Sequence, residues 1–278
     1  MKKWAFTKMQ GTGNDFVLLD AFRTPLRVTP SLAQRLCDRR FGVGADQVLV
    51  LGKSSRADFR MGIYNADGSQ VEMCGNGIRC LARYVYERGY TKKTAFTVET
   101  LAGVKRPVMI KGGVRVDMGT PVLDGSLIPT RGKNRVIEAP LPSGWFPGGP
   151  KNLRMTCVSM GNPHTVLFVP SVQAVPLETW GPALEKNPFF PRRTNVEFVE
   201  TINPDHVRVR VWERGSGVTL ACGTGACSVA VAGVLTGRTH RKVCVSLPGG
   251  DLFVEWAPDD HVYLSGPAAF VFDGEFFY

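Results

Sequence analysis

The sequence predicts an α+β protein made of two pseudo-symmetric domains, because one segment of the chain occurs twice. The motif Cys-Gly-x-Gly begins at Cys74 and begins again at Cys222, 148 residues later. The same offset relates Gly13-Asn14 to Gly161-Asn162, and it holds without a gap from about residue 13 to residue 83. This pattern indicates an internal duplication in which each copy contributes one cysteine.

The composition is typical of an enzyme without a nucleic-acid or membrane partner. The net charge is +10, but the basic residues are scattered, which favours a solvated basic surface that attracts an anionic substrate. No stretch approaches the ~20 apolar residues that span a bilayer. Seven cysteines without an export signal predict reduced thiols and a cytoplasmic location.

The first copy alternates strands and helices. Thr29 is expected to cap a helix that has Pro30 at its first position and ends near Gly42, and a second helix is expected from Gly75 to Gly89. Strands are expected at 6–9, 16–20, 48–51 and 59–64, followed by hairpins between 96 and 118.

The second copy repeats this plan. It predicts a strand–turn–strand at 158–169, a helix at 177–186, and strands at 196–199 and 207–211. The helix after Cys222 is apolar on every side, so a sheet is expected to enclose it. Residues 124–152 are rich in Gly and Pro and predict a loop-bearing insertion. The predicted domains are 1–123, joined by a returning segment 268–278, and 124–267.

A cysteine at a helix start suits acid–base chemistry. The first N–H groups of a helix lack internal partners and carry the positive end of the macrodipole, which stabilises a thiolate and lowers its pKa. The same N–H groups, approached closely at glycines, bind a carboxylate. If the copies face each other, two thiols would line one cleft, so one face of a carbon could lose a proton while the other gains one.

Two other interpretations of the cysteines remain. A cysteine at a helix start can simply be a small buried apolar residue. A metal site is disfavoured, since the spacing of Cys74 and Cys80 fits common zinc motifs badly and differs from that of Cys222 and Cys227.

Seven segments together resemble the diaminopimelate epimerase family, in the family's order and over nearly the whole chain. They are 8–16 (KMQGTGNDF), 42–47 (GVGADQ), 65–77 (NADGSQVEMCGNG), 159–164 (SMGNPH), 193–198 (RTNVEF), 212–217 (WERGSG) and 221–226 (ACGTGA). The resemblance implies two similar domains, each a mixed sheet rolled around a central helix, with the active site between them. It also implies a pyridoxal-independent epimerase without cofactor or metal that acts on diaminopimelate, and a homodimer with a contact near Phe272.

The family's functional positions fall on residues of both copies. The catalytic cysteines would be Cys74 and Cys222, with His164 and Glu213 beside the reacting groups and Arg214 facing the distal carboxylate. The other substrate-binding positions would be Asn14, Gln47, Asn65, Gly75, Asn76, Asn162, Asn195, Glu213, Gly223 and Thr224. Two residues depart from the family's usual pattern, Thr12 and Val218, and neither is a ligand position.

The predicted reaction is a two-base epimerisation that interconverts LL- and meso-diaminopimelate in lysine and cell-wall biosynthesis. One cysteine removes the α-proton as thiolate, and the other delivers a proton as thiol. No lysine-centred motif for pyridoxal phosphate and no P-loop lysine accompanies the glycines. The alternatives are a racemase of the same fold for another amino acid and a basic two-domain binding protein. Proline racemases usually have His where this chain has Asn76.

Overall fold

The computed structural model describes residues 3–132, 134–142, 144–145, 148–150 and 152–277. The chain forms two compact units, which we describe one at a time. Unit 1 comprises residues 1–117 and 265–278, and unit 2 comprises residues 118–264. Part of the predicted insertion at 124–152, residues 133, 143, 146–147 and 151, lies outside the described residues.

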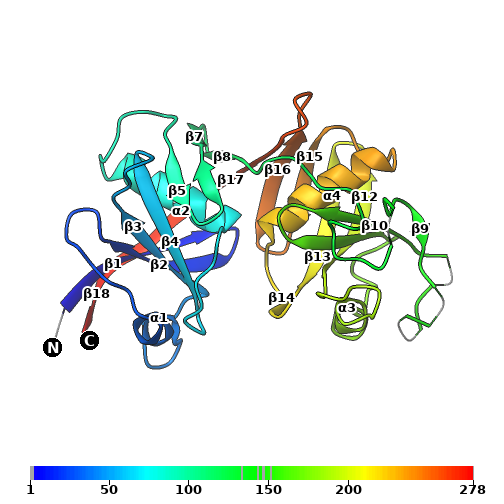
Figure 1. Ribbon diagram of the computed structural model, residues 1–278, viewed down its shortest axis with the longest axis horizontal. Coiled ribbons are helices and arrows are strands. Elements are labelled where there is room, and N and C mark those ends of the chain that lie inside the picture. Colours follow the sequence, from blue (N-terminus) through cyan, green and yellow to red (C-terminus); the bar gives the residue numbers. More distant parts are fainter. Residues whose placement is uncertain (1–2, 133, 143, 146–147, 151, 278) are drawn as a thin grey trace. The chain divides into compact units, whose positions relative to one another are not determined.

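Unit 1 contains a seven-stranded sheet in the order β18-β1-β2-β3-β4-β5-β6 (Figure 1). The strands are β1 (Lys3–Gly11), β2 (Asn14–Asp20), β3 (Gln47–Gly52), β4 (Phe59–Asn65), β5 (Val98–Thr100), β6 (Gly103–Lys105) and β18 (Ala269–Phe277). A separate antiparallel hairpin joins β7 (Pro107–Ile110) to β8 (Gly113–Asp117). The last strand, β18, pairs antiparallel with the first, so the two ends of the chain share one edge of this sheet.

Unit 2 repeats the same strand pattern in the order β17-β16-β15-β13-β12-β11-β10-β9. The strands are β9 (Ala139–Pro140), β10 (Arg154–Ser159), β11 (Pro163–Phe168), β12 (Asn195–Asn203), β13 (His206–Glu213), β15 (Lys242–Leu247), β16 (Gly250–Trp256) and β17 (Val262–Gly266). A two-residue strand, β14 (Gly217–Val218), pairs with β13.

The pairing of strands shows the duplication directly. β2 runs parallel to β3 and β3 antiparallel to β4, and β11, β12 and β13 pair in the same senses. The register is also repeated at the offset of 148, because Phe16 faces Gln47 and His164 faces Asn195. Side chains at matched positions therefore point to the same face of each sheet.

Each unit has one long helix among its strands and one shorter helix on other strands. The long helices are α2 (Gly75–Glu87), which contacts β1, β2, β3, β4, β7 and β8, and α4 (Gly223–Leu235), which contacts β10, β11, β12, β15 and β16. The short ones are α1 (Pro30–Cys37), on β3 and β4, and α3 (Leu177–Glu185), on β12, β13 and β14. The predicted enclosure of the apolar helix after Cys222 is confirmed, since α4 lies in a core of buried valines and alanines.

Several predicted boundaries are wrong: the strands predicted to begin at 6 and 158 begin at Lys3 and Arg154, and two further ends have a clear physical cause. The first helix ends at Cys37, not near Gly42, because Asp38 leaves helical geometry and its carboxylate accepts the N–H groups of Arg40 and Phe41. Gly42 then passes so close to the Arg35 carbonyl oxygen that a Cβ would lie 1.8 Å from it. The strand predicted at 196–199 extends to Asn203, because its antiparallel pairing with β13 continues to His206.

Candidate active site: two helix starts

Cys74 occupies the cap position of α2, as the sequence predicts. Its backbone is extended (φ −138°, ψ 118°), and its Sγ accepts the N–H of Gly77 at 3.4 Å. A capping side chain normally supplies an oxygen to the free N–H groups at a helix start. Here sulfur takes that position, so the thiol lies at the positive end of the helix.

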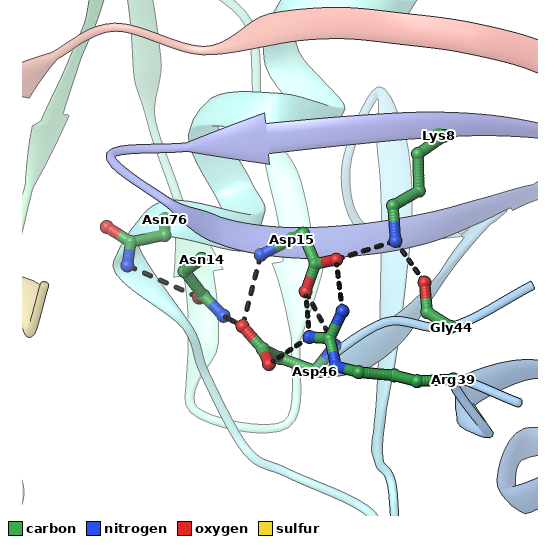
Figure 2. Close-up of polar contacts among 7 residues, drawn as sticks. All are labelled: Lys8, Asn14, Asp15, Arg39, Gly44, Asp46 and Asn76. Carbon is green, nitrogen blue, oxygen red and sulfur yellow. Dashed lines mark hydrogen bonds and ion pairs between the residues drawn. The ribbon is translucent and has the colours of Figure 1, made fainter. Parts of the chain in front are cut away.

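Asn14 lies beside the Cys74 thiol and also contacts Asn76, and Figure 2 shows the contact between the two asparagines. The Oδ1 atom of Asn14 accepts hydrogen bonds from Cys74 Sγ at 3.7 Å and from Asn76 Nδ2 at 3.3 Å. Asn14 begins β2 and Asn76 lies in the first turn of α2. The structure thus brings together three of the predicted site residues of unit 1.

The amides of Gln47 and Asn65 form a second pair in the same unit. They face each other across β3 and β4, where Gln47 Nε2 donates to Asn65 Oδ1 at 2.8 Å. Asn65 Nδ2 donates in turn to Ser69 Oγ at 3.0 Å. Gln47 Oε1 and Asn76 Oδ1 are buried acceptors without a hydrogen-bond partner among the described residues.

Cys222 caps α4 in the same way. Its Sγ accepts the N–H of Gly225 at 3.4 Å and lies 3.5 Å from Thr224 Oγ1. The Cys222 side chain is almost fully buried, with 6% of its surface exposed, whereas Cys74 is half-buried. The two caps share one backbone geometry and differ in access to solvent.

The expected lowering of the cysteine pKa is wrong for Cys222. Burial raises the pKa of this thiol well above its usual range, and the Glu213 and Glu197 carboxyls raise it further. Hydrogen bonds from Thr224 and from the Gly225 N–H act in the opposite direction but do not outweigh these effects. Burial also raises the pKa of Glu213 itself. Desolvation therefore outweighs the helix start at this position.

A buried chain of polar side chains lies under the start of α4. His164 Nδ1 is 2.6 Å from Glu197 Oε1, and His164 Nε2 is 3.0 Å from Asn162 Oδ1. His164 and Glu197 are both fully buried. The parallel pairing of β11 with β12 brings these two side chains together.

The other predicted residues of unit 2 lie at the ends of β12 and β13. Asn195 Nδ2 donates to the Pro163 carbonyl at 2.7 Å, while Asn195 Oδ1 accepts the backbone N–H of Arg214 at 2.9 Å. Glu213 accepts a hydrogen bond from Thr219 Oγ1 at 2.5 Å, and Arg214 Nη1 donates to the Arg192 carbonyl at 3.1 Å. Asn195 therefore fixes the backbone that carries Glu213 and Arg214.

A family model described as diaminopimelate epimerase matches residues 6–123 and 156–271. The chain belongs to the diaminopimelate epimerase family. The predicted family is therefore confirmed.

Curated relatives of that name match over nearly their whole length. The diaminopimelate epimerase of Pelotomaculum thermopropionicum is 53% identical, covering 98% of this chain and 99% of the relative. The diaminopimelate epimerase of Moorella thermoacetica is 52% identical, covering 98% of each.

Solved structures share the fold at low identity, and they confirm the predicted α+β fold class. A Bacillus anthracis phenazine biosynthesis protein of the PhzF family is 16% identical, with a TM-score of 0.72 over 100% of both chains. A hydroxyproline epimerase from Agrobacterium vitis is 14% identical, with a TM-score of 0.68 over 99% of this chain and 92% of that one.

The remaining sequence predictions concern the surface and metals. Phe272 lies on the edge strand β18, half exposed, with its ring 5.8 Å from that of Phe6. Within the described part of the chain, no helix is long and apolar enough to cross a membrane. The described residues also contain no group of three or more His, Cys, Asp or Glu side chains arranged to hold a metal ion.

Sequence reasoning missed two residues next to the predicted ones. Glu197 contacts His164, and Asp46 accepts a hydrogen bond from Asn14. A signal for Glu197 was present in the repeat, because the matched position in the first copy is Leu49. A carboxylate at the position of a leucine, between the apolar residues Val196 and Phe198, predicts a special environment.

Proposed function

We propose that Cys74 and Cys222 are the acid and the base of a cofactor-independent epimerisation at the α-carbon of diaminopimelate. As a member of its family, the chain is an isomerase of lysine and peptidoglycan-precursor biosynthesis that interconverts LL- and meso-diaminopimelate. The observation that carries the assignment of residues is the repeated cap, in which each thiol accepts a glycine N–H at 3.4 Å.

The proton balance of the reaction needs only the two thiols. One thiolate takes the α-proton and becomes a thiol, while the other thiol gives its proton to the opposite face and becomes a thiolate. After one turnover the two cysteines have exchanged states. Proton exchange with solvent restores them for a second turnover in the same direction, and the reverse reaction uses them as they stand.

Charge that builds on the substrate during this reaction needs oriented donors. The backbone N–H groups at Gly75-Asn76 and at Gly223-Thr224 belong to the first turns of α2 and α4, where helices lack internal acceptors. We assign the carboxylate next to the reacting carbon to these N–H groups. One oriented donor of this kind typically contributes about 3–4 kcal/mol to the transition state.

Amide and ionic groups are proposed to hold the rest of the substrate. A buried acceptor without a partner costs about 1–3 kcal/mol, so the free Gln47 Oε1 and Asn76 Oδ1 support a ligand that carries N–H donors, such as an ammonium group. Arg214 is assigned to the distal carboxylate, which a guanidinium can bind through two hydrogen bonds. The remaining contacts are assigned to Asn14, Asn65, Asn162, Asn195 and Glu213, with His164 in support.

Exchange of the α-proton in deuterium oxide tests this function. The purified protein is incubated with LL-diaminopimelate, and the products are followed by NMR and chiral separation. Conversion to meso-diaminopimelate with one deuterium at the inverted carbon is expected. L-Lysine, which lacks the distal carboxylate, serves as the control and should exchange at least about 10-fold more slowly, since a lost charge-assisted pair costs about 1.5–3 kcal/mol or more. Inversion of proline in place of diaminopimelate would contradict the proposed substrate.

A homodimer and a cytoplasmic location remain predictions. The exposed ring of Phe272 on an edge strand supports the first, because edge strands present free backbone groups to a partner. Sedimentation of the wild-type protein and of Phe272→Asp checks it, and a monomeric wild type would contradict it.

A further inference from the structure

The side chain of Asn14 is held between two different kinds of partner. On one side, Asn14 Nδ2 donates to Asp46 Oδ2 at 2.8 Å. On the other side, Asn14 Oδ1 accepts from Cys74 Sγ. It also accepts from Asn76 Nδ2, a contact drawn in Figure 2. An amide has a donor end and an acceptor end of nearly equal shape, so its partners decide which end faces which way.

Asp46 decides the orientation because an ionised carboxylate can only accept hydrogen bonds. Its Oδ1 accepts from Arg39 Nη2 at 2.8 Å, and its Oδ2 accepts the backbone N–H of Asp15 at 3.2 Å in addition to Asn14. All three partners are donors. If Asn14 turned its carbonyl towards Asp46, two acceptors would meet, so the Asn14 carbonyl must face Cys74.

Asp46 is itself held by a network of ion pairs in unit 1. Asp15 accepts hydrogen bonds from Arg39 at 2.8 and 3.1 Å and from Lys8 Nζ at 2.7 Å, and Lys8 also donates to the Gly44 carbonyl. Burial alone would raise the pKa of Asp15, but the hydrogen bonds from Arg39 and Lys8 lower it to about 2. Arg39 therefore joins the two carboxylates, while the backbone N–H of Asp15 holds Asp46 next to Asn14 independently of Arg39.

We infer that Asp46 is a positioning residue, which keeps the acceptor end of the Asn14 amide against the Cys74 thiol. In this orientation Asn14 can accept the S–H of a thiol but offers nothing to a thiolate. The turned amide would donate an N–H to a thiolate and stabilise it. The inference rests on the proposed role of Cys74, yet its effect on the resting thiol can be measured without substrate.

The other groups next to the Cys74 sulfur do not replace this effect. Asn76 and the Gly77 N–H, both on α2, carry no charge. Cys80, on the same helix, interacts electrostatically with Cys74, but burial raises the pKa of Cys80 to about 12, so this thiol stays neutral below that pH. Turning the Asn14 amide, on β2, therefore changes the balance between thiol and thiolate at Cys74.

The experiment measures the rate of Cys74 alkylation by iodoacetamide against pH, with the modified peptide quantified by mass spectrometry. In Asp46→Ala the Asn14 amide can turn together with that of Asn76, whose unpartnered Oδ1 then accepts an N–H of Asn14. The midpoint of the Cys74 profile is expected to fall by about one pH unit, because the thiolate gains a hydrogen bond. Arg39→Ala is the matched control, because it removes the ion pairs of the network and keeps the Asn14–Asp46 hydrogen bond. Its midpoint should not fall.

Loss of the Asp46 charge could by itself lower the midpoint, so a double-mutant cycle with Asn14→Ala separates the two causes. If Asp46 acts through Asn14, Asp46→Ala shifts the midpoint only when Asn14 is present. An equal shift in both backgrounds, or no shift in either, would overturn the inference. Failure of the proposed function would appear separately, as absence of epimerisation by the wild-type protein.

Discussion

The starts of α2 and α4 have the same backbone and different side chains beneath them. At Gly77, an added Cβ would lie 3.0 Å from Leu49 Cδ2 and 3.5 Å from the Phe16 ring. At the matched Gly225, it would lie 2.8 Å from Glu197 Oε1. Unit 1 thus supports its helix start with Phe16 and Leu49, and unit 2 supports the equivalent turn with His164 and Glu197, all four fully buried.

The ionic groups of unit 1 lie elsewhere. Its network of Lys8, Asp15, Arg39 and Asp46 has no ionisable counterpart in unit 2, where the positions at the same offset are Thr156, Pro163, Asn187 and Thr194. The duplication therefore preserved the cap geometry and changed the electrostatics around it. Cys74 lies against neutral amides, while Cys222 lies near two carboxyls that raise its pKa.

The largest expected effect is the loss of either capping thiol. Cys222→Ala should lower kcat for diaminopimelate by about 10²–10⁴-fold, which is the usual contribution of a positioned acid or base. Cys244→Ala is the control. It removes a partly buried thiol on β15 and should retain wild-type turnover. A Cys222→Ala protein with more than a tenth of wild-type kcat would show that this thiol is not a reacting group.

The second effect concerns the buried pair under α4. Glu197→Leu leaves His164 without its partner and should lower the free energy of unfolding by about 3–5 kcal/mol. Adding His164→Phe recreates the pair that unit 1 uses, and should recover about 2 kcal/mol or more, because a matched apolar pair can replace a buried polar one. Urea unfolding of the single and double variants checks this.

A double variant no more stable than Glu197→Leu would contradict the comparison between the two helix starts. It would mean that the two starts require different side chains for reasons other than the polarity of the pair.

The smallest effect concerns the network of unit 1. Because the pKa of Asp15 falls from 3.8 to about 2 on folding, Asp15 stabilises the protein above pH 4, and this stabilisation is lost as the pH falls towards 2. Asp15→Asn should therefore cost about 2 kcal/mol at pH 6 and progressively less below pH 4. Urea unfolding at several pH values measures the difference, and a cost that does not change with pH would contradict the ionic origin.

The sequence predicted the elements because their signals are local. Thr29-Pro30 marks a helix start through its own side chain and ring, and the repeated Cys-Gly-x-Gly marks two more. The end of the first helix was missed, because it depends on how the Asp38 carboxylate binds the next N–H groups.

The site was only partly predictable for a related reason. Asn14, Cys74 and Asn76 belong to recognisable motifs, but the partners that orient them come from other strands and loops. Asp46 reaches Asn14 across 32 residues, and Glu197 reaches His164 across 33. The raised pKa of Cys222 was missed because a helix start is visible in a sequence, whereas burial beside two carboxyls is a sum over the folded unit.

The most direct test of the two-thiol account is isotope exchange in the single-cysteine variants. Cys74→Ala and Cys222→Ala are each incubated in deuterium oxide with LL- and, separately, with meso-diaminopimelate, and α-deuterium is measured by NMR. Each remaining thiol can reach one face of the carbon, so we expect inversion by either variant to fall by about 10²–10⁴-fold. We also expect each to exchange the α-proton of one stereoisomer only, with opposite choices in the two variants. Exchange of the same stereoisomer by both variants, or inversion by either at more than a tenth of the wild-type rate, would contradict the account.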